Sequence, residues 1–457
     1  MKSNRRVAVG LCLTSIAVAA SPVLAGPKSK KEPASAQRRE KRADAVVKAL
    51  AAGKYADATK WFDKTLKGAL PAAKLEEIWK SLETQCGSFK SFGPQHARKD
   101  GGNNAISVPA EFDKAKLQLQ LVFDKSDKIT GFWIKPAEGA DLSPKPSAPP
   151  PYDEPGMYTE TAVEFGKSPW TINGKLTVPR MRVLCPVVVL VHGSGPHDED
   201  ETIGPNKVFR DLAYGLSSNG VAVLRYHKRT HAHKAELAKT GKITVREEVI
   251  DDALAALKFV RTQSNVDTSR VYLLGHSLGA TLAPQIATDD KKLGGVVLLS
   301  GTSRNFYDVI LGQLSYLASL PGPDQEVTRK LFEENRKKIA LTRFGKAQPG
   351  TDLLGAPIGY WDDLNKYAQK AVPQAAALDC RILVCGGGRD HQITKEDFEI
   401  YRKGLGSRKN VTFKWYDDLN HLYMTGKGMS TPAEYEKAGY VDKKVIDDLA
   451  EWIREGS

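Results

Sequence analysis

The segment Val271-Tyr-Leu-Leu-Gly-His-Ser-Leu-Gly-Ala-Thr-Leu282 determines which fold the chain can adopt. Residues 271–274 are apolar enough to predict a buried strand, and the residues from Gly279 onward predict a helix. Between them, Gly275-His276-Ser277-Leu278-Gly279 predicts a tight, strained turn that lifts the Ser277 hydroxyl clear of the sheet. The glycines two residues before and after the serine prevent clashes in that turn. The arrangement predicts a nucleophilic serine, with an ordinary glycine turn as the alternative.

Apolar runs that resemble strands alternate with helical stretches on both sides of this segment. Continuous apolar strands separated by helices predict a mostly parallel sheet that is covered by helices on both faces. The stretch from about 303 to 376 breaks the alternation and predicts a helical insertion that covers a pocket. The predicted strands are 187–191, 221–224, 271–274, 296–299, 382–384 and 411–415, and the predicted helices are near 206–218, 245–263, 279–288, 394–404 and 442–454.

Two further chemical groups follow predicted strands. Asp390 ends the run that starts at Ile382, and His421 follows the strand that ends near residue 415. Serine is a poor nucleophile at neutral pH, so it needs an imidazole base and a carboxylate that holds the base in the right tautomer. The chain order Ser277, Asp390, His421 is one of the known orders of such a triad. These three residues are the predicted catalytic group.

The same loops offer rival residues for the base and the acid. His391 is a rival base, but as the neighbour of Asp390 it should point elsewhere. Asp417 and Asp418 are rival acids, but they share a loop with His421 and follow the wrong strand. We therefore retain Asp390 and His421.

The run His192-Gly193-Ser194-Gly195-Pro196 directly follows the predicted strand 187–191. An attacked carbonyl becomes a tetrahedral oxyanion, and its charge needs backbone N–H donors that are already in place. Leu278 N–H, at the start of the helix after the serine, is one expected donor. Ser194 N–H is the other, because Gly193 and Gly195 let the main chain approach closely; Gly195 N–H is the alternative.

With these residues in place, 157–457 resembles an α/β hydrolase. The resemblance rests on His192–Gly195, Gly275–Gly279, Asp390 and His421, each at the expected strand end. Within that superfamily the chain resembles secreted bacterial carboxylesterases in which a small α+β module precedes the hydrolase. Around Gly359-Tyr-Trp-Asp-Asp-Leu364 it is also similar to the serine aminopeptidase branch. The resemblance implies a two-step reaction through an acyl-serine, without a metal or organic cofactor, whereas dienelactone-type enzymes would carry Cys at the nucleophile position.

The expected substrate is a small or medium carboxylic ester. His276 and the aromatic residues Tyr360 and Trp361 of the insertion are the predicted pocket residues. The alternative function is an amino- or oligopeptidase, in which Asp362 and Asp363 would bind a substrate ammonium. A third possibility is a non-catalytic binding protein on a hydrolase scaffold, in which the N-terminal module does the work.

The basic loop 227–234 contains His227, His231 and His233, which suggests a metal site at first sight. Lys228, Arg229 and Lys234 stand among them, and their charge repels a cation. We therefore expect no metal and no cofactor.

The charge of the chain is concentrated near its start. The 457 residues carry a formal net charge of +13, from 67 Lys and Arg against 54 Asp and Glu, and much of it falls before residue 45. The remainder is close to balance, so charge gives no reason to expect a nucleic-acid partner. Residues 1–25 have the basic start, short apolar run and small-residue exit of a secretory signal, and we expect cleavage after Ala25.

Removal of this signal predicts a secreted or periplasmic protein without a membrane span. Residues 26–44 are expected to form a basic, flexible leader, and 45–136 a small α+β domain with helices first and then a hairpin of strands 116–123 and 129–134. This domain lacks clustered titratable groups, so we do not expect chemistry there; the sequence leaves its role unknown, with self-association or partner binding as the candidate. A Pro-rich linker, 137–156, precedes the catalytic domain, 157–457.

Overall fold

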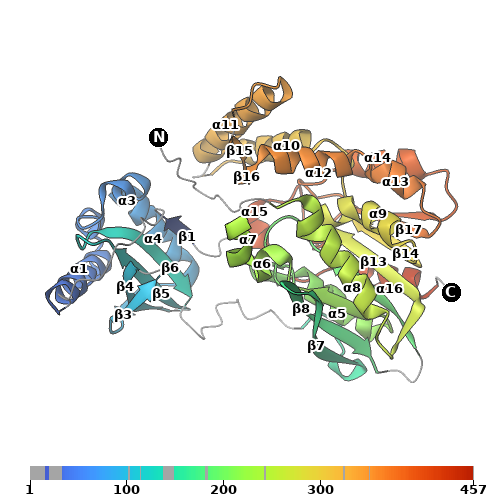
Figure 1. The fold of residues 1–457 in the computed structure, drawn as a ribbon, viewed down its shortest axis with the longest axis horizontal. Coiled ribbons are helices and arrows are strands. Elements are labelled where there is room, and N and C mark those ends of the chain that lie inside the picture. Colours follow the sequence, from blue (N-terminus) through green and yellow to red (C-terminus); the bar gives the residue numbers. More distant parts are fainter. Residues whose placement is uncertain are drawn as a thin grey trace. The chain divides into compact units, whose positions relative to one another are not determined.

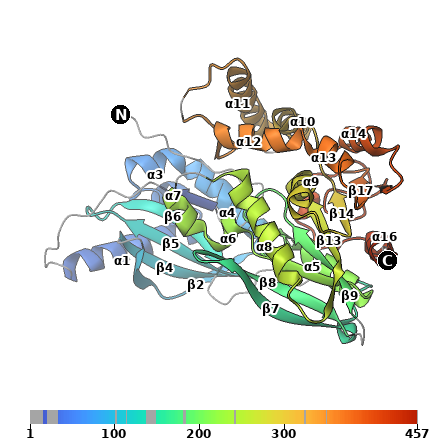
Figure 2. The same ribbon diagram turned by 45° about the vertical axis from the view of Figure 1, so that its right-hand side comes forward.

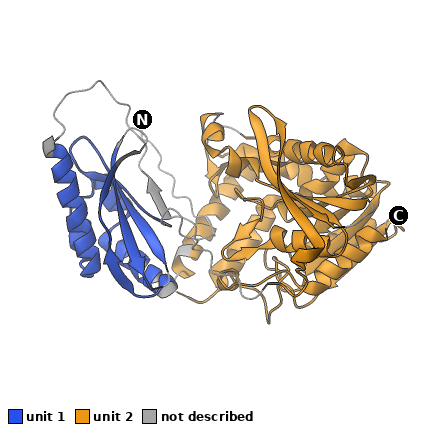
Figure 3. Ribbon diagram, turned by 90° about the horizontal axis from the view of Figure 1, so that it is seen from below, with its two compact units in different colours: residues 1–144 blue, residues 145–457 orange. Residues whose placement is uncertain are grey.

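The computed structural model describes residues 16–19, 33–100, 103–113, 115–136, 149–180, 184–240, 243–322, 325–348 and 350–455. The chain divides into two compact units, residues 1–144 and 145–457, which Figure 3 distinguishes by colour. Each unit has its own apolar core.

The N-terminal unit packs its helices against an antiparallel sheet in the order β1-β6-β5-β4-β2, with β3 paired to β4. The predicted hairpin is present as β5 and β6, while the sequence analysis missed β1, β2, β3 and β4. The helices are α1 (Pro33–Ala51), α2 (Tyr55–Ala58), α3 (Lys64–Ala69) and α4 (Ala72–Cys86), and the strands are β1 (Ile16–Ala19), β2 (Phe89–Phe92), β3 (His96–Asp100), β4 (Asn103–Phe112), β5 (Lys116–Phe123) and β6 (Ile129–Pro136).

The prediction of a flexible leader over 26–44 is wrong for residues 33–44, which belong to α1. Basic side chains of this helix have partners in the same unit: Arg38 Nε lies 2.9 Å from Asp127 Oδ2, and the Arg42 guanidinium stacks over the Trp61 ring at 4.5 Å. These contacts explain why a basic stretch is ordered here. Residues 26–32 lie outside the described residues.

Most of the predicted signal segment also lies outside the described residues. Its residues 16–19 form β1, which pairs antiparallel with β6. In the described part of the chain, no helix is long and apolar enough to cross a membrane.

The second unit is built on a sheet in the order β18-β17-β14-β13-β9-β12-β8-β7 (Figures 1 and 2). The strands from β18 to β12 are parallel, as predicted, and β8 and β7 add an antiparallel edge that the sequence analysis did not predict. The strands are β7 (Tyr158–Lys167), β8 (Trp170–Pro179), β9 (Cys185–Val191), β12 (Ala222–Tyr226), β13 (Val266–His276), β14 (Gly295–Leu299), β17 (Arg381–Gly387) and β18 (Val411–Tyr416), and a separate short pair is β10 (Thr202–Ile203) and β11 (Asn206–Lys207).

Alternate residues of the central strands feed two cores, one on each face of the sheet. In β9, Val187, Val189 and Val191 enter one core, while Val188 and Leu190 enter the other. Helices α8 (Asp251–Val260), α9 (Leu278–Asp290) and α14 (Lys395–Leu405) cover the first face, and α5 (Val208–Ser218) and α16 (Lys443–Arg454) cover the second. The fold is therefore an α/β hydrolase, a mostly parallel sheet between two layers of helices.

The helical insertion lies between β14 and β17. Within it α10 packs on α11 and α12, and α12 packs on α9 of the main domain (Figure 1). Its elements are α10 (Phe306–Ser319), α11 (Gln325–Arg343), β15 (Asp352–Leu353), β16 (Ala356–Pro357), α12 (Ile358–Ala368) and α13 (Ala371–Ala376). The remaining short helices are α6 (Arg229–Ala232), α7 (Lys234–Thr240) and α15 (Pro432–Tyr435), a 3-10 turn spans Pro155–Met157, and a π-helical turn, Arg246–Ile250, leads into α8.

The turn between β13 and α9 is possible because two glycines allow close backbone contact. A Cβ on Gly275 would lie 2.3 Å from Gly279 O, and a Cβ on Gly279 would lie 2.1 Å from Val191 O. Ser277 between them has φ 54° and ψ −114°, a conformation that non-glycine residues rarely adopt. The surrounding packing imposes this strain at the candidate nucleophile.

We expect Gly279→Ala to lower the free energy of unfolding by about 2 kcal/mol or more, because its methyl group would overlap the Val191 carbonyl. Gly312→Ala, inside α10 with no atom within 4 Å of the added Cβ, is the control and should be neutral or stabilising by up to about 1 kcal/mol. Thermal unfolding of both variants measures the difference. Equal midpoints for both would contradict the close contact.

Candidate active site

Four loops that carry the predicted residues leave the same edge of the sheet. A continuous parallel run of the sheet contains β9, β13, β14, β17 and β18. Their carboxyl ends therefore lie at the same edge of the sheet. Gly193 follows β9, Ser277 follows β13, Asp390 follows β17 and His421 follows β18. A Cβ on Gly193 would lie 3.3 Å from the Ser277 Cβ, so the loop after β9 contacts the serine.

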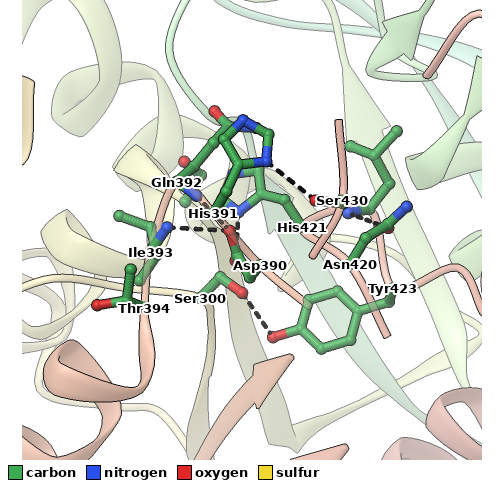
Figure 4. A network of polar contacts seen from close by, with 12 residues as sticks. Ser300, Asp390, His391, Gln392, Ile393, Thr394, Asn420, His421, Tyr423 and Ser430 are labelled. Atoms are coloured by element: carbon green, nitrogen blue, oxygen red, sulfur yellow. Dashed lines mark hydrogen bonds and ion pairs between the residues drawn. The ribbon is translucent and has the colours of Figure 1, made fainter. Parts of the chain in front are cut away.

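Asp390 and His421 form a direct buried pair. His421 Nδ1 donates to Asp390 Oδ2 at 2.6 Å, and Asp390 Oδ1 accepts from the backbone N–H groups of Gln392 and Ile393 at 2.8 and 2.9 Å (Figure 4). Burial raises the pKa of Asp390, but the His421 ring and these N–H donors outweigh it and hold the pKa below its usual value. The carboxylate is thus ionised and fixed against the imidazole.

The loop of His421 is held by its own side chains. Asn420 Oδ1 accepts from the N–H groups of Leu422 and Met424, and the Tyr423 hydroxyl donates to the Cys385 carbonyl at 3.1 Å. The Ser277 hydroxyl and His421, both within the described residues, form no hydrogen bond to each other. Contacts of this kind often tighten only when substrate binds.

His276, the residue before the serine, is buried with 1% exposure and both ring nitrogens are occupied. Nδ1 lies 2.9 Å from Glu201 Oε2, and Nε2 lies 2.9 Å from the His421 backbone oxygen. Both polar atoms of the ring are therefore engaged by protein groups, and that His276 also contacts substrate stays a prediction. Its ring connects the serine turn to the loop of His421.

Glu201 completes this connection on the other side. Its Oε1 accepts from Gly193 N–H at 2.6 Å, so one carboxylate binds both the loop after β9 and His276. Burial raises the pKa of Glu201, but His276 and the nearby His197 and His192 lower it to about 2. Burial lowers the pKa of His276, and the Glu201 carboxylate outweighs that effect and raises it. We therefore describe Glu201 and His276 as a buried ion pair.

The loop after β9 has most of its polar groups engaged. Gly193 N–H donates to Glu201, Gly193 O accepts from Lys228 Nζ at 2.9 Å, and Ser194 O accepts from His197 Nε2 at 2.7 Å. Within the described ranges, the N–H groups of Ser194 and Leu278 have no such partner. That these two donors bind an oxyanion stays a prediction, and Gly195, at φ 106°, continues the turn.

The rival residues are engaged elsewhere. His391 Nδ1 lies 2.9 Å from Ser430 Oγ (Figure 4). The His391 ring also stacks on Tyr316, and burial lowers the pKa of His391 to about 4. Asp417 is exposed and accepts from Trp415 Nε1, and Asp418 pairs with Lys444.

The predicted pocket residues of the insertion are used partly in packing. The Trp361 indole N–H donates to the Leu353 carbonyl at 2.9 Å, and the Tyr360 hydroxyl interacts with the Glu248 carboxylate. Both rings are half-buried at the contact of α12 with the main domain. That Tyr360 and Trp361 also contact substrate stays a prediction.

A cavity of about 270 Å³ lies between α10 and the loop after β17. Gly312, Gln313 and Tyr316 line it on one side, and His391 and Gln392 line it on the other. Neither Ser277 nor His421 is among the lining residues, so this cavity lies beside the candidate site.

Among the described residues, the histidine-rich loop 227–234 forms no group of three or more His, Cys, Asp or Glu side chains that could hold a metal ion. His233 Nε2 lies 2.6 Å from the Thr171 carbonyl, and His227 Nδ1 lies 3.0 Å from Glu199 Oε2. These rings are occupied by protein partners.

Sequence reasoning missed Glu201 and Lys228, two charged residues that touch the oxyanion loop. The available signal was their position in the chain. Glu201 ends the acidic run 198–201 in the segment after β9, and Lys228 lies two residues after β12. Charged residues near buried strand ends need partners. The sequence alone does not tell which partners they find.

We expect Glu201→Gln to destabilise the protein at pH 7, because it leaves His276 without its counter-ion. The folded pKa of Glu201, about 2, lies below its ordinary value of 4.5, so its contribution is complete above pH 4.5 and is lost as pH falls toward 2. The difference in unfolding free energy between wild type and variant should therefore shrink over that range in denaturant titrations.

The control is Glu199→Gln, in the same acidic run, whose carboxylate pairs with two part-exposed side chains, Lys175 and His227. It should change the free energy of unfolding by no more than about 1 kcal/mol. A Glu201→Gln variant as stable as wild type at pH 7 would rule out the ion pair.

Comparison with known proteins supports the same fold. Residues 184–427 match the family described as serine aminopeptidase, S33, and residues 43–132 match a family described as a protein of unknown function, DUF3887. Esterase EstD of Thermotoga maritima is 38% identical over 408 residues, covering 89% of this chain and 93% of that protein.

Solved structures of low sequence identity also match. An esterase of Pyrococcus furiosus is 14% identical, with 65% of this chain and 91% of that chain covered and a TM-score of 0.41. An acylaminoacyl peptidase of Pyrococcus horikoshii is 12% identical, with 82% and 57% covered and a TM-score of 0.45. By its family match and its relationship to Esterase EstD, the chain belongs to the serine aminopeptidase S33 family of α/β hydrolases.

Proposed function

We propose that the chain is a serine carboxylesterase that cleaves small to medium carboxylic esters through an acyl-Ser277 intermediate. The observation that carries the proposal is the buried Asp390–His421 pair, at the sheet edge that also holds the strained Ser277 and two open amide donors. The relationship to Esterase EstD supports ester substrates.

In the proposed mechanism, His421 Nε2 takes the proton of the Ser277 hydroxyl as Oγ attacks the ester carbonyl carbon. The N–H groups of Ser194 and Leu278 stabilise the oxyanion that forms. The tetrahedral intermediate collapses, and the alcohol leaves with the proton from His421. Water, activated by the same imidazole, then hydrolyses the acyl-serine, while Asp390 holds the ring and stabilises its charged form.

An aminopeptidase of the same fold is the second candidate, because the family model carries that description. Its substrate ammonium would need a free carboxylate near the pocket. Asp362 Oδ1 already accepts from the Tyr307 hydroxyl at 2.6 Å, and Asp363 Oδ2 accepts from Val245 N–H at 3.2 Å. These internal contacts favour the esterase.

We expect the purified chain to hydrolyse p-nitrophenyl acetate and butyrate and to be labelled by a fluorophosphonate. Ser277→Ala should abolish both, and Asp390→Asn should lower kcat by about 10⁴-fold, because the His421 ring loses the carboxylate that fixes its tautomer. Initial rates and intact mass after labelling measure these effects.

Asp417→Asn is the matched control, since this carboxylate lies near His421 along the chain but is exposed and outside the pair. It should retain full activity. Turnover unaffected by Ser277→Ala would refute the proposed nucleophile, and faster cleavage of aminoacyl p-nitroanilides than of esters would favour the aminopeptidase.

We also propose that the chain is exported and cleaved after Ala25, on the strength of the basic start, apolar run and small residues in 1–25. The mature protein should then begin at Gly26. Intact-mass measurement of the protein from the cell envelope or medium checks this, and a full-length cytosolic product would contradict it. A partner-binding or self-associating role for the N-terminal unit stays a prediction.

A further inference from the structure

Lys228 is a buried cation that no step of the proposed reaction uses. It follows β12 by two residues and is 2% exposed. Its Nζ lies 2.9 Å from the Gly193 carbonyl oxygen and 2.6 Å from Glu248 Oε1. Burying an ammonium group is costly, so both contacts are needed to keep it in place.

The Gly193 carbonyl belongs to the same peptide unit as the Ser194 N–H. Because a peptide unit is planar, a hydrogen bond that fixes the oxygen also fixes the direction of the N–H. A charged donor at the oxygen further polarises the amide, and hydrogen bonds in such a chain strengthen one another. The Ser194 N–H is the donor assigned to the oxyanion in the proposed function.

We propose that Lys228 is a positioning residue for the oxyanion hole: it orients and polarises the Gly193–Ser194 peptide. This inference rests on the proposed function, since it assigns a task to the same site. Glu201 accepts from the Gly193 N–H, whereas Lys228 donates to the Gly193 carbonyl. Two oppositely charged side chains thus hold both backbone polar groups of Gly193. The peptide is therefore aligned before substrate arrives, as electrostatic catalysis requires.

Glu248 extends the arrangement to the helical insertion. It lies in the π-helical turn before α8, pairs with Lys228, and interacts with the hydroxyl of Tyr360 in α12. A continuous chain of polar contacts thus runs from the insertion through Glu248 and Lys228 to the Gly193 carbonyl.

The competing explanation is that Lys228 only stabilises the fold, as an ordinary buried ion pair would. The neighbouring pair Arg229–Asp252 offers a matched comparison, because it is also buried and Arg229 Nε lies 3.0 Å from Asp252 Oδ2. Arg229 additionally stacks over Trp170, away from the oxyanion loop. Breaking this pair tests the cost of losing a buried cation alone.

The experiment compares Lys228→Met and Arg229→Met in the full chain, with active sites counted by fluorophosphonate labelling. For Lys228→Met, kcat per labelled site on p-nitrophenyl butyrate should fall about 10- to 100-fold, while KM stays within about twofold of wild type. The expected loss is smaller than the roughly 10²- to 10³-fold loss of kcat that removal of a whole oxyanion donor causes. Inhibition by an alkyl trifluoromethyl ketone, which forms an oxyanion on the serine, should weaken by a similar factor. Arg229→Met should leave both quantities per labelled site unchanged.

A purely structural Lys228 would lower the number of labelled sites or the thermal midpoint, but not kcat per site or ketone affinity; that result would overturn the inference. If Lys228→Met does not fold, Glu248→Gln, which removes the carboxylate charge that faces Lys228 and Tyr360, should shift kcat and ketone affinity in the same direction by at least threefold, and no shift would overturn the inference. A wild-type chain that hydrolyses no ester and takes no label refutes the proposed function itself, a distinct outcome.

Discussion

The buried carboxylate of Glu201 is the contact on which the geometry of the site depends. One of its oxygens holds the Gly193 N–H and the other holds His276, whose second nitrogen holds the carbonyl of His421. Glu201 and His276 together thus connect the loop after β9, the end of β13 and the loop after β18. Glu201 itself has φ 48°, a backbone strain that persists only because these contacts over-determine its position.

Charges buried beside a reacting centre are costly, and here each has a partner. Glu201 faces His276, Lys228 faces Glu248, and Asp390 faces His421. Buried ion pairs contribute little to net stability, because desolvation offsets their attraction. Their effect at this sheet edge is to restrict each loop to one arrangement, so that amide donors and imidazole do not need to reorganise during the reaction. Stability for this arrangement comes from the apolar cores on the two faces of the sheet.

The sequence predicted those features that follow from local pattern. Apolar runs located the parallel strands, and Ser277, Asp390 and His421 were found because each stands just after such a run. Strands β7 and β8 were missed because an edge hairpin with one exposed side lacks a continuous apolar run. The contacts of His276, Glu201 and Lys228 were not predicted, because they depend on partners far away in the chain. The helix over 33–44 was missed because its basic residues find Asp127 and Trp61 only in the folded unit.

The most direct test of the central claim is the crystal structure of the full chain with a phosphonate bound at its active site. The account predicts a covalent bond to Ser277 Oγ, and one phosphonyl oxygen about 2.7–3.1 Å from the N–H groups of both Ser194 and Leu278. The Glu201, His276 and Lys228 contacts around Gly193 should be retained. An adduct on another residue, or a phosphonyl oxygen directed away from both amides, would contradict it.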